Sequence, residues 1–202
     1  MLTKGDPMVQ HDYVMALDLP LPQRRDLPED IQQAFAEADK ELGMLPNVFA
    51  AFTHNVDQLR ALMAMYQALM YPGSGLSDLE REMIAVAVSS TNHCYYCQVS
   101  HGFSVRALSG DPVLGELMVM NYRAANLSHR QRAMLDFAVK LTKESHTITE
   151  ADRQALRDAG FSDRDIWDIA NVAGFYNMTN RIASATNMQP NLEYHFLNRA
   201  RS

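Results

Sequence analysis

The sequence predicts an all-α fold of several helices, with no significant β-sheet. Apolar residues recur at helical spacing in one segment after another, and residues typical of helix starts and stops stand at the boundaries of these segments. We find no run that alternates apolar and polar residues between turn residues, which a half-buried strand would show. With 202 residues, the chain is long enough for one domain with a sizeable core.

The N-terminal part divides into an arm and the first helices. Residues 1–26 carry no helical period and contain three prolines, so we expect an extended arm, followed by a single helical domain over residues 27–202. Pro28 is expected at the first helical position of a helix that Gly43 ends. The segment 46–55 is expected to form a short apolar turn or helix. Residues 56–70 have helical spacing, and the sequence "YPGSG" breaks this helix.

The remaining helices have clear start signals. Ser77 is followed three residues later by Glu80, which is a capping-box pattern before the apolar run "MIAVAV". Ser128, Thr149 and Ser162 are further candidate N-caps. Helices are therefore expected after residue 77 and at residues 95–108, 112–125, 128–144, 149–159, 162–186 and 190–199.

Two of the expected helices begin with similar sequences. "LSDLEREMIAVAV" (76–88) and "LSHRQRAMLDFAV" (127–139) align without gaps. The similarity is explained equally well by an internal repeat or by two independently capped amphipathic helices. If the repeat is real, only the first copy carries chemistry, because the second has Ala133 at the position of Glu82 and Ser145 at that of Cys94.

Composition excludes several classes of protein. The net charge of −6 and the lack of a Lys/Arg cluster argue against a nucleic-acid partner. The first residues contain no apolar stretch of signal-peptide length, and the apolar runs are shorter than the roughly 18 residues of a membrane span. We therefore expect a cytoplasmic protein with no membrane partner. In a reducing compartment, two nearby cysteines favour metal binding or catalysis over a structural disulfide.

The two cysteines of the chain, Cys94 and Cys97, lie in one stretch, "NHCYYCQVSHG". The preceding residues are good turn formers, so Cys94 is expected near a helix N-terminus and Cys97 one turn inside it. This spacing brings the sulfurs close enough to form a disulfide. The free N–H groups of the helix end favour thiolate. His101 lies four residues after Cys97, on the same face, where it can accept a proton or hold a thiolate as an ion pair.

Glu82 is the fourth candidate residue. It opens an apolar run, so its helix is expected to be buried on most sides, and a carboxylate in apolar surroundings can exchange protons near neutral pH. Periodicity alone favours a simpler alternative, in which Glu82 faces solvent or pairs with Arg81 or another nearby arginine. His93 and Tyr96 flank the cysteines as possible supporting residues.

The cysteine pair also has other interpretations. A zinc site is the main rival, with Cys94, Cys97 and His101 as ligands and His93 or Glu82 as the fourth, but structural zinc sites usually draw ligands from two separated pairs. Attachment of a c-type haem needs His directly after the second cysteine, where this chain has Gln98. A thioredoxin-like fold needs a βαβ pattern, which is missing.

The spacing of Glu82, Cys94, Cys97 and His101 resembles the signature of AhpD-like alkylhydroperoxidases in the carboxymuconolactone decarboxylase superfamily. The segments "LGMLPNVFAAFTHN", "AGFSDRDIWDIANVAGFYNMTNRIA" and "QPNLEYH" resemble its peroxidase-related branch, so the resemblance covers residues 27–197. It implies an all-α fold with a helical-hairpin core and a homo-oligomer, commonly a trimer or hexamer. It also implies that Cys97 attacks a hydroperoxide, Cys94 forms the disulfide, and His101 and Glu82 relay protons.

The sequence departs from this pattern at Tyr96, where peroxidases of the family have a histidine. Tyrosine is a poor base at neutral pH but donates hydrogen bonds. We expect a thiol-dependent hydroperoxide reductase or related disulfide oxidoreductase that needs no cofactor or metal and is regenerated by a small thiol or a protein reductant. The alternatives are a non-catalytic zinc-binding or redox-sensing module and a decarboxylase-like enzyme on the same fold.

Overall fold

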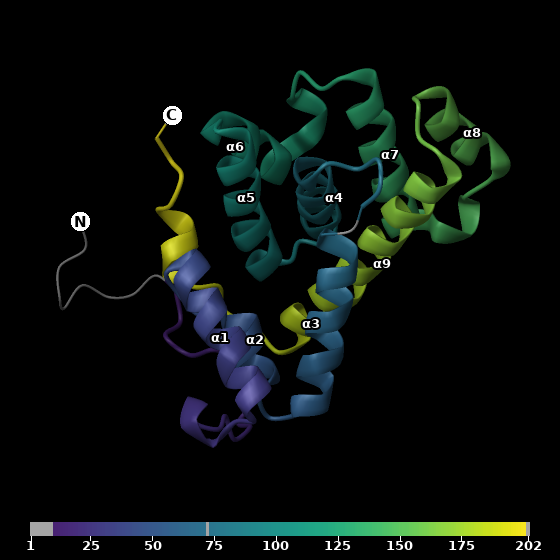
Figure 1. Cartoon of the computed structure of the whole chain (residues 1–202). Helices are drawn as coiled ribbons and strands as arrows, with labels where there is room; N and C mark the ends of the chain where they lie inside the picture. The colour runs from purple at the N-terminus through teal and green to yellow at the C-terminus, as the bar shows by residue number, and fades with distance from the viewer. Residues whose placement is uncertain (1–9, 72, 201–202) are drawn as a thin grey trace.

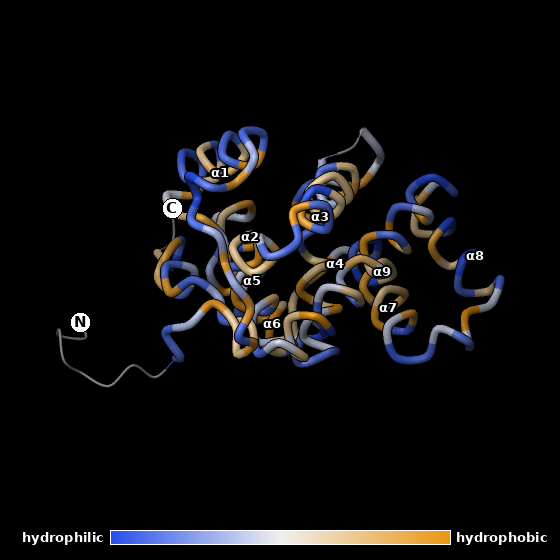
Figure 2. Tube along the Cα trace, turned by 90° about the horizontal axis from the view of Figure 1, so that it is seen from below, coloured by the Kyte–Doolittle hydropathy of each residue, from blue (hydrophilic) through white to orange (hydrophobic). Residues whose placement is uncertain are grey.

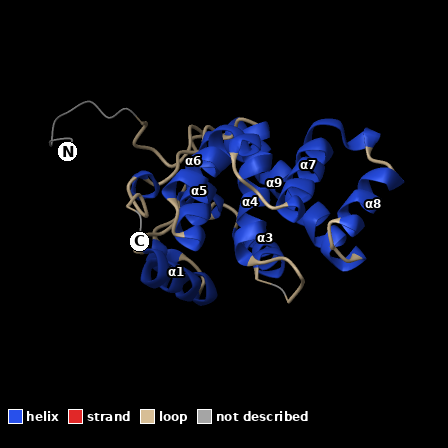
Figure 3. Cartoon of the chain, turned by 90° about the horizontal axis from the view of Figure 1, so that it is seen from above, coloured by secondary structure: helices blue, strands red, loops and turns tan. Residues whose placement is uncertain are grey.

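The computed structural model describes residues 10–71 and 73–200, and within them the chain forms helices and no strands (Figures 1 and 3). The all-α prediction is confirmed. The α-helices are α1 (Glu29–Leu42), α2 (Asn47–Phe52), α3 (Val56–Met70), α4 (Asp78–Thr91), α5 (Tyr95–Ser109), α6 (Pro112–Asn121), α7 (His129–Glu144), α8 (Glu150–Asp158) and α9 (Asp163–Ala185).

Helix α4 is the centre of the molecule, with α5, α6, α7 and α9 packed around it (Figure 1). Residues 80–89 are all buried, as expected for the apolar run that follows the first turn. The predicted capping box starts the helix: the Ser77 hydroxyl accepts from the Glu80 amide at 3.2 Å, and the Glu80 carboxylate accepts from the Ser77 amide at 2.9 Å.

Helices α4 and α5 form a tight hairpin that carries the cysteines. The chain turns over residues 92–94, and His93 takes the left-handed conformation with φ of 54°. Cys94 is the N-cap of α5, and Cys97 is its third residue. Both positions agree with the sequence prediction, because the turn-forming residues before Cys94 stop α4 at this point.

Helix boundaries differ from the predictions in three places. Pro28 is the N-cap of α1 rather than its first helical residue, and α6 ends at Asn121, where a 3-10 turn (Tyr122–Ala124) follows. The helix expected at 190–199 is only a 3-10 turn, Leu192–His195. The Arg106 guanidinium donates to the carbonyls of Tyr194 and Leu197 and so ties this turn to α5.

The described part of the N-terminal arm lies against the C-terminal end of α9. Ala16 donates its amide to the Thr186 carbonyl at 2.8 Å, and the Gln189 amide donates to the Val14 carbonyl at 2.9 Å. Residues 1–9 of the predicted arm lie outside the described residues. The division into an arm and one domain stays a prediction.

Hydropathy follows the packing. In Figure 2 the hydrophilic residues of α1 and α8 lie mainly on the sides turned away from the other helices. The two segments proposed as a repeat form the starts of α4 and α7, which pack together and both begin with capping boxes. In the described parts of the chain, none of the helices combines the length and the apolar character that a bilayer crossing requires.

Candidate active site

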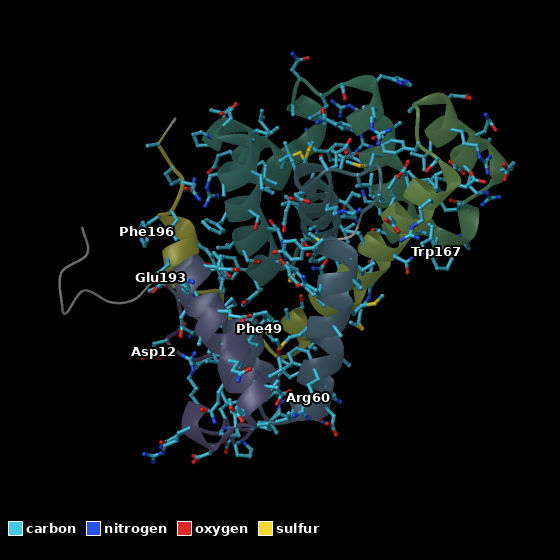
Figure 4. The ribbon with its side chains drawn as sticks, in the orientation of Figure 1. Asp12, Phe49, Arg60, Trp167, Glu193 and Phe196 are labelled. Atoms are coloured by element: carbon cyan, nitrogen blue, oxygen red, sulfur yellow. The ribbon has the colours of Figure 1, made fainter. Side chains whose placement is uncertain are left out.

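A cavity of about 830 Å³ opens between α1, α3, α5 and α9, and it holds three of the four candidate residues. Cys97, His101 and Glu82 line it together with many aromatic and aliphatic side chains, and a volume of this size is typical of small-molecule sites. Phe49, one of the lining residues, lies near the middle of the molecule between α1 and α3 (Figure 4). The helices that carry the motif therefore build a pocket that can admit an organic molecule.

The two cysteines differ in their access to this cavity. Both are free thiols and both are buried, Cys94 with 1% and Cys97 with 4% of its surface exposed. Both belong to one small buried apolar cluster, but Cys97 lines the cavity and Cys94 does not. A molecule that enters the cavity therefore meets Cys97.

The thiols are hydrogen-bonded to each other, and this changes their acidity in opposite directions. A hydrogen bond from Cys97 lowers the pKa of Cys94 to about 7, although burial opposes the shift; the Cys97 amide, the Ser184 hydroxyl and the charge of His101 lower it further. The same bond, together with burial and the charge on Cys94, raises the pKa of Cys97 well above its ordinary value. As the pH rises through about 7, the pair therefore comes to hold one proton and one negative charge between two sulfurs.

Glu82 and His101 form a direct pair. His101 Nδ1 lies 2.7 Å from Glu82 Oε2, and the side chains are only 14% and 8% exposed. The simpler alternative for Glu82, facing solvent or pairing with Arg81, is therefore wrong. Arg81 instead contacts Asp168 at 3.4 Å. Because an ionised carboxylate only accepts hydrogen bonds, Nδ1 carries the hydrogen and Nε2 is left for proton transfer in the cavity.

Sequence reasoning missed a group of tyrosines around this pair. The Tyr176 ring packs edge-on against the His101 ring, with centroids 4.5 Å apart. Burial raises the pKa of Tyr66, Tyr176 and Tyr194, and the Glu82 carboxylate raises each of them further. These hydroxyls therefore stay protonated, and that of Tyr176 donates to the Met70 sulfur at 3.5 Å. No short-range spacing links them to the motif, so the sequence offered no signal.

A second missed group lies beside Cys97. Ser89 and Asn180 are fully buried, and the Asn180 amide donates to the Ser89 hydroxyl at 3.0 Å. Asn180 in turn accepts from the Asn92 amide at 2.9 Å. The side chains of Asn180 and Ser89 act to lower the pKa of Cys97, against the larger effects that raise it. They are the polar groups that favour negative charge on this sulfur.

The two supporting residues suggested by sequence have different positions. Tyr96 lines the cavity, but its hydroxyl accepts from the Val48 amide at 2.9 Å and so ties α5 to α2. Burial raises its pKa well above the ordinary value, so it is not a base. His93 is exposed, in the turn between α4 and α5, and does not line the cavity.

The described residues do not form a metal site. Over residues 10–71 and 73–200, no group of three or more His, Cys, Asp or Glu side chains is arranged to hold a metal ion. The two residues considered as a fourth zinc ligand are unsuited to that role, because His93 is exposed in its turn and Glu82 is engaged by His101. We therefore do not propose a zinc site.

Part of the chain matches a known protein family. The carboxymuconolactone decarboxylase family profile matches residues 57–108, which run from α3 to α5 and include Glu82, both cysteines and His101. No curated protein matches the chain.

Solved structures resemble the whole chain. An uncharacterised peroxidase-related protein from Silicibacter sp. TM1040 is 58% identical, with a TM-score of 0.91, over 96% of this chain and 100% of that one. A peroxidase-related protein from Ralstonia eutropha JMP134, described as an alkylhydroperoxidase AhpD core, is 41% identical, with a TM-score of 0.91, over 95% of this chain and 100% of that one. The debrominase Bmp8 shares the fold at 19% identity, with a TM-score of 0.74, over 92% of this chain and 95% of that one.

Proposed function

This chain belongs to the AhpD-like carboxymuconolactone decarboxylase family, and from that membership we propose that it is a thiol-dependent reductase of organic hydroperoxides. The observation that carries the proposal is the placement of Cys97, His101 and Glu82 in one cavity, with Cys94 in contact with Cys97 from behind. A thiol, a second thiol and a proton carrier are the groups that such a reaction requires.

In the first step, Cys97 attacks the terminal oxygen of the hydroperoxide as a thiolate. Its proton passes along the existing hydrogen bond to the Cys94 sulfur, which moves the shared negative charge to the cavity side. The sulfur–oxygen bond forms as the oxygen–oxygen bond breaks, which leaves a sulfenic acid on Cys97 and an alkoxide. Protonated His101, held by Glu82, supplies the proton that turns the alkoxide into an alcohol.

In the second step, Cys94 attacks the Cys97 sulfur. The disulfide forms, and the hydroxyl group of the sulfenic acid leaves as water with the Cys94 proton. Per turnover, two thiols are oxidised to one disulfide and one hydroperoxide is reduced to an alcohol and water. An external thiol or a protein reductant then restores both cysteines by thiol–disulfide exchange.

Access and acidity favour different cysteines for the attack, and we assign it to Cys97. The pKa of Cys94 is the lower of the two, but its sulfur does not face the cavity. Because one proton transfer within the pair converts either thiolate into the other, the sulfur that the substrate can reach determines the reaction. Asn180 and Ser89 assist by favouring the charge on Cys97.

The test is a thiol count after one equivalent of cumene hydroperoxide is added to the reduced protein. We expect a fast loss of both thiols, and a Cys97→Ser variant that keeps its remaining thiol. A Cys94→Ser variant should still react once and retain a sulfenic acid, which dimedone traps. Hydroperoxide consumption at the wild-type rate by Cys97→Ser would refute the assignment.

A further inference from the structure

The carboxylates at the cavity entrance indicate which charge the substrate has. This inference rests on the proposed hydroperoxide reductase activity and specifies which hydroperoxides this site takes. The lining residues divide into a buried floor and an exposed rim. The floor includes Cys97 and Glu82, and the rim includes Glu37, Glu41 and Asp78, all of them exposed.

The negative charge on the rim has no lysine or arginine beside it among the described lining residues, and Lys40, which lies between Glu37 and Glu41 in α1, does not line the cavity. Of the lining residues that the structure describes, His101 is the one basic side chain, and it is engaged by Glu82. Arginines near the C-terminal tail are engaged elsewhere: Arg106 donates to backbone carbonyls, and Arg199 pairs with Glu116. The net charge of −6 adds a field of the same sign.

The inner wall is mainly apolar. It is built from aromatic and aliphatic side chains, among them Phe49, Phe52, Leu62, Met70, Phe103 and Phe175. Such a wall binds the body of an organic molecule by the hydrophobic effect and offers little to hydrogen peroxide itself. A carboxylate carried past the rim would also lose water without gaining a cationic partner.

We propose that this site takes uncharged hydroperoxides with a bulky apolar or aromatic body and selects against those that carry a carboxylate. The rim carboxylates repel an anion at the entrance, and the wall gives no compensating ion pair. Hydroperoxides of free fatty acids are therefore poor substrates, whereas neutral aryl or ester hydroperoxides of similar size are good ones.

The test uses two substrates with the same skeleton, one anionic and one neutral: cumene hydroperoxide with a para-carboxylate, and its methyl ester. With dithiothreitol as the reductant, we expect kcat/KM for the ester to exceed that for the acid by at least tenfold at low salt. The ratio should fall at high ionic strength, because salt screens the rim charges.

Variants separate the rim from the general charge of the protein. In Glu37→Gln/Glu41→Gln/Asp78→Asn the ester-to-acid ratio should fall severalfold, through a faster reaction of the acid. The control Asp18→Asn/Glu144→Gln/Asp158→Asn removes three exposed carboxylates that do not line the cavity, and it should keep the wild-type ratio.

Equal kcat/KM for the acid and the ester, or the same change of ratio in both triple variants, would overturn the charge selectivity and leave the reductase activity standing. If neither substrate is consumed and no thiol is lost on mixing, the proposed function fails, and this inference fails with it.

Discussion

The hydrogen bond between His101 and Glu82 leads to a prediction about proton transfer. Glu82→Gln keeps the size of the side chain and an oxygen that accepts from Nδ1, but it removes the negative charge that stabilises a protonated imidazole. The two groups are 2.7 Å apart and mostly buried, so solvent screens this interaction little.

A hydrogen bond to a charged group contributes about 1.5–3 kcal/mol. If Glu82 applies this energy in the step where His101 donates its proton, kcat/KM for cumene hydroperoxide should fall by roughly 10- to 150-fold, since each 1.36 kcal/mol is a factor of ten. The assay is steady-state consumption of cumene hydroperoxide with dithiothreitol as the reductant. The extent of thiol loss in a single turnover should remain two per chain.

Glu80→Gln is the matched control. Glu80 is also a buried glutamate of α4, but it bonds to Ser77 and Arg130 and does not line the cavity. Its substitution should lower the melting temperature without changing kcat/KM by more than about twofold, since capping interactions contribute roughly 0.5–2 kcal/mol.

A double-mutant cycle decides whether Glu82 acts through His101. If it does, Glu82→Gln combined with His101→Gln should be little slower than His101→Gln alone. Fully additive effects, or a Glu82→Gln enzyme as fast as Glu80→Gln, would refute the reasoning.

Three further predictions concern acidity, access and assembly. Cys97→Ala removes the main cause of the low pKa of Cys94. In the wild type, the thiolate absorbance at 240 nm should appear as the pH rises through about 7, and in the variant the midpoint of this titration should move toward the ordinary thiol value of 9.0. An unchanged midpoint would contradict this cause. Met15, from the N-terminal arm, belongs to the same buried cluster as Cys94. Met15→Ala in a Cys97→Ser background should therefore increase the rate at which 5,5′-dithiobis(2-nitrobenzoate) modifies Cys94, and an equal rate would mean that the arm does not cover this thiol. Met65 and Trp167 expose apolar surface on α3 and α9, and Trp167 lies at the edge of the molecule (Figure 4). We therefore propose a homo-oligomer, a trimer or hexamer, which should sediment at a mass above the 22.8 kDa of one chain at micromolar concentration. Met65→Glu or Trp167→Glu should weaken this assembly.

Much of the fold could be predicted because its signals are local. Ser77 with Glu80 and the periodicity of residues 56–70 define helix starts and extents within a few neighbouring residues. The prediction of a helix at residues 190–199 was wrong because this segment has contacts with a distant part of the chain. Arg106, which lies almost 90 residues away in the sequence, donates to a carbonyl of this segment, and no local pattern predicts such a contact.

The sequence by itself determined that two thiols lie at the start of one helix with a histidine four residues further on, since helix geometry fixes these neighbours. Only the tertiary structure decided that Glu82 reaches His101, that Tyr176 packs on the same ring, and that Cys97 rather than Cys94 faces the cavity. These relations depend on how α4, α5 and α9 pack against one another, which is a matter of shape and burial between distant segments. The negative charge at the cavity entrance also depends on packing, because the carboxylates of α1 and of the start of α4 line one cavity only in the folded chain.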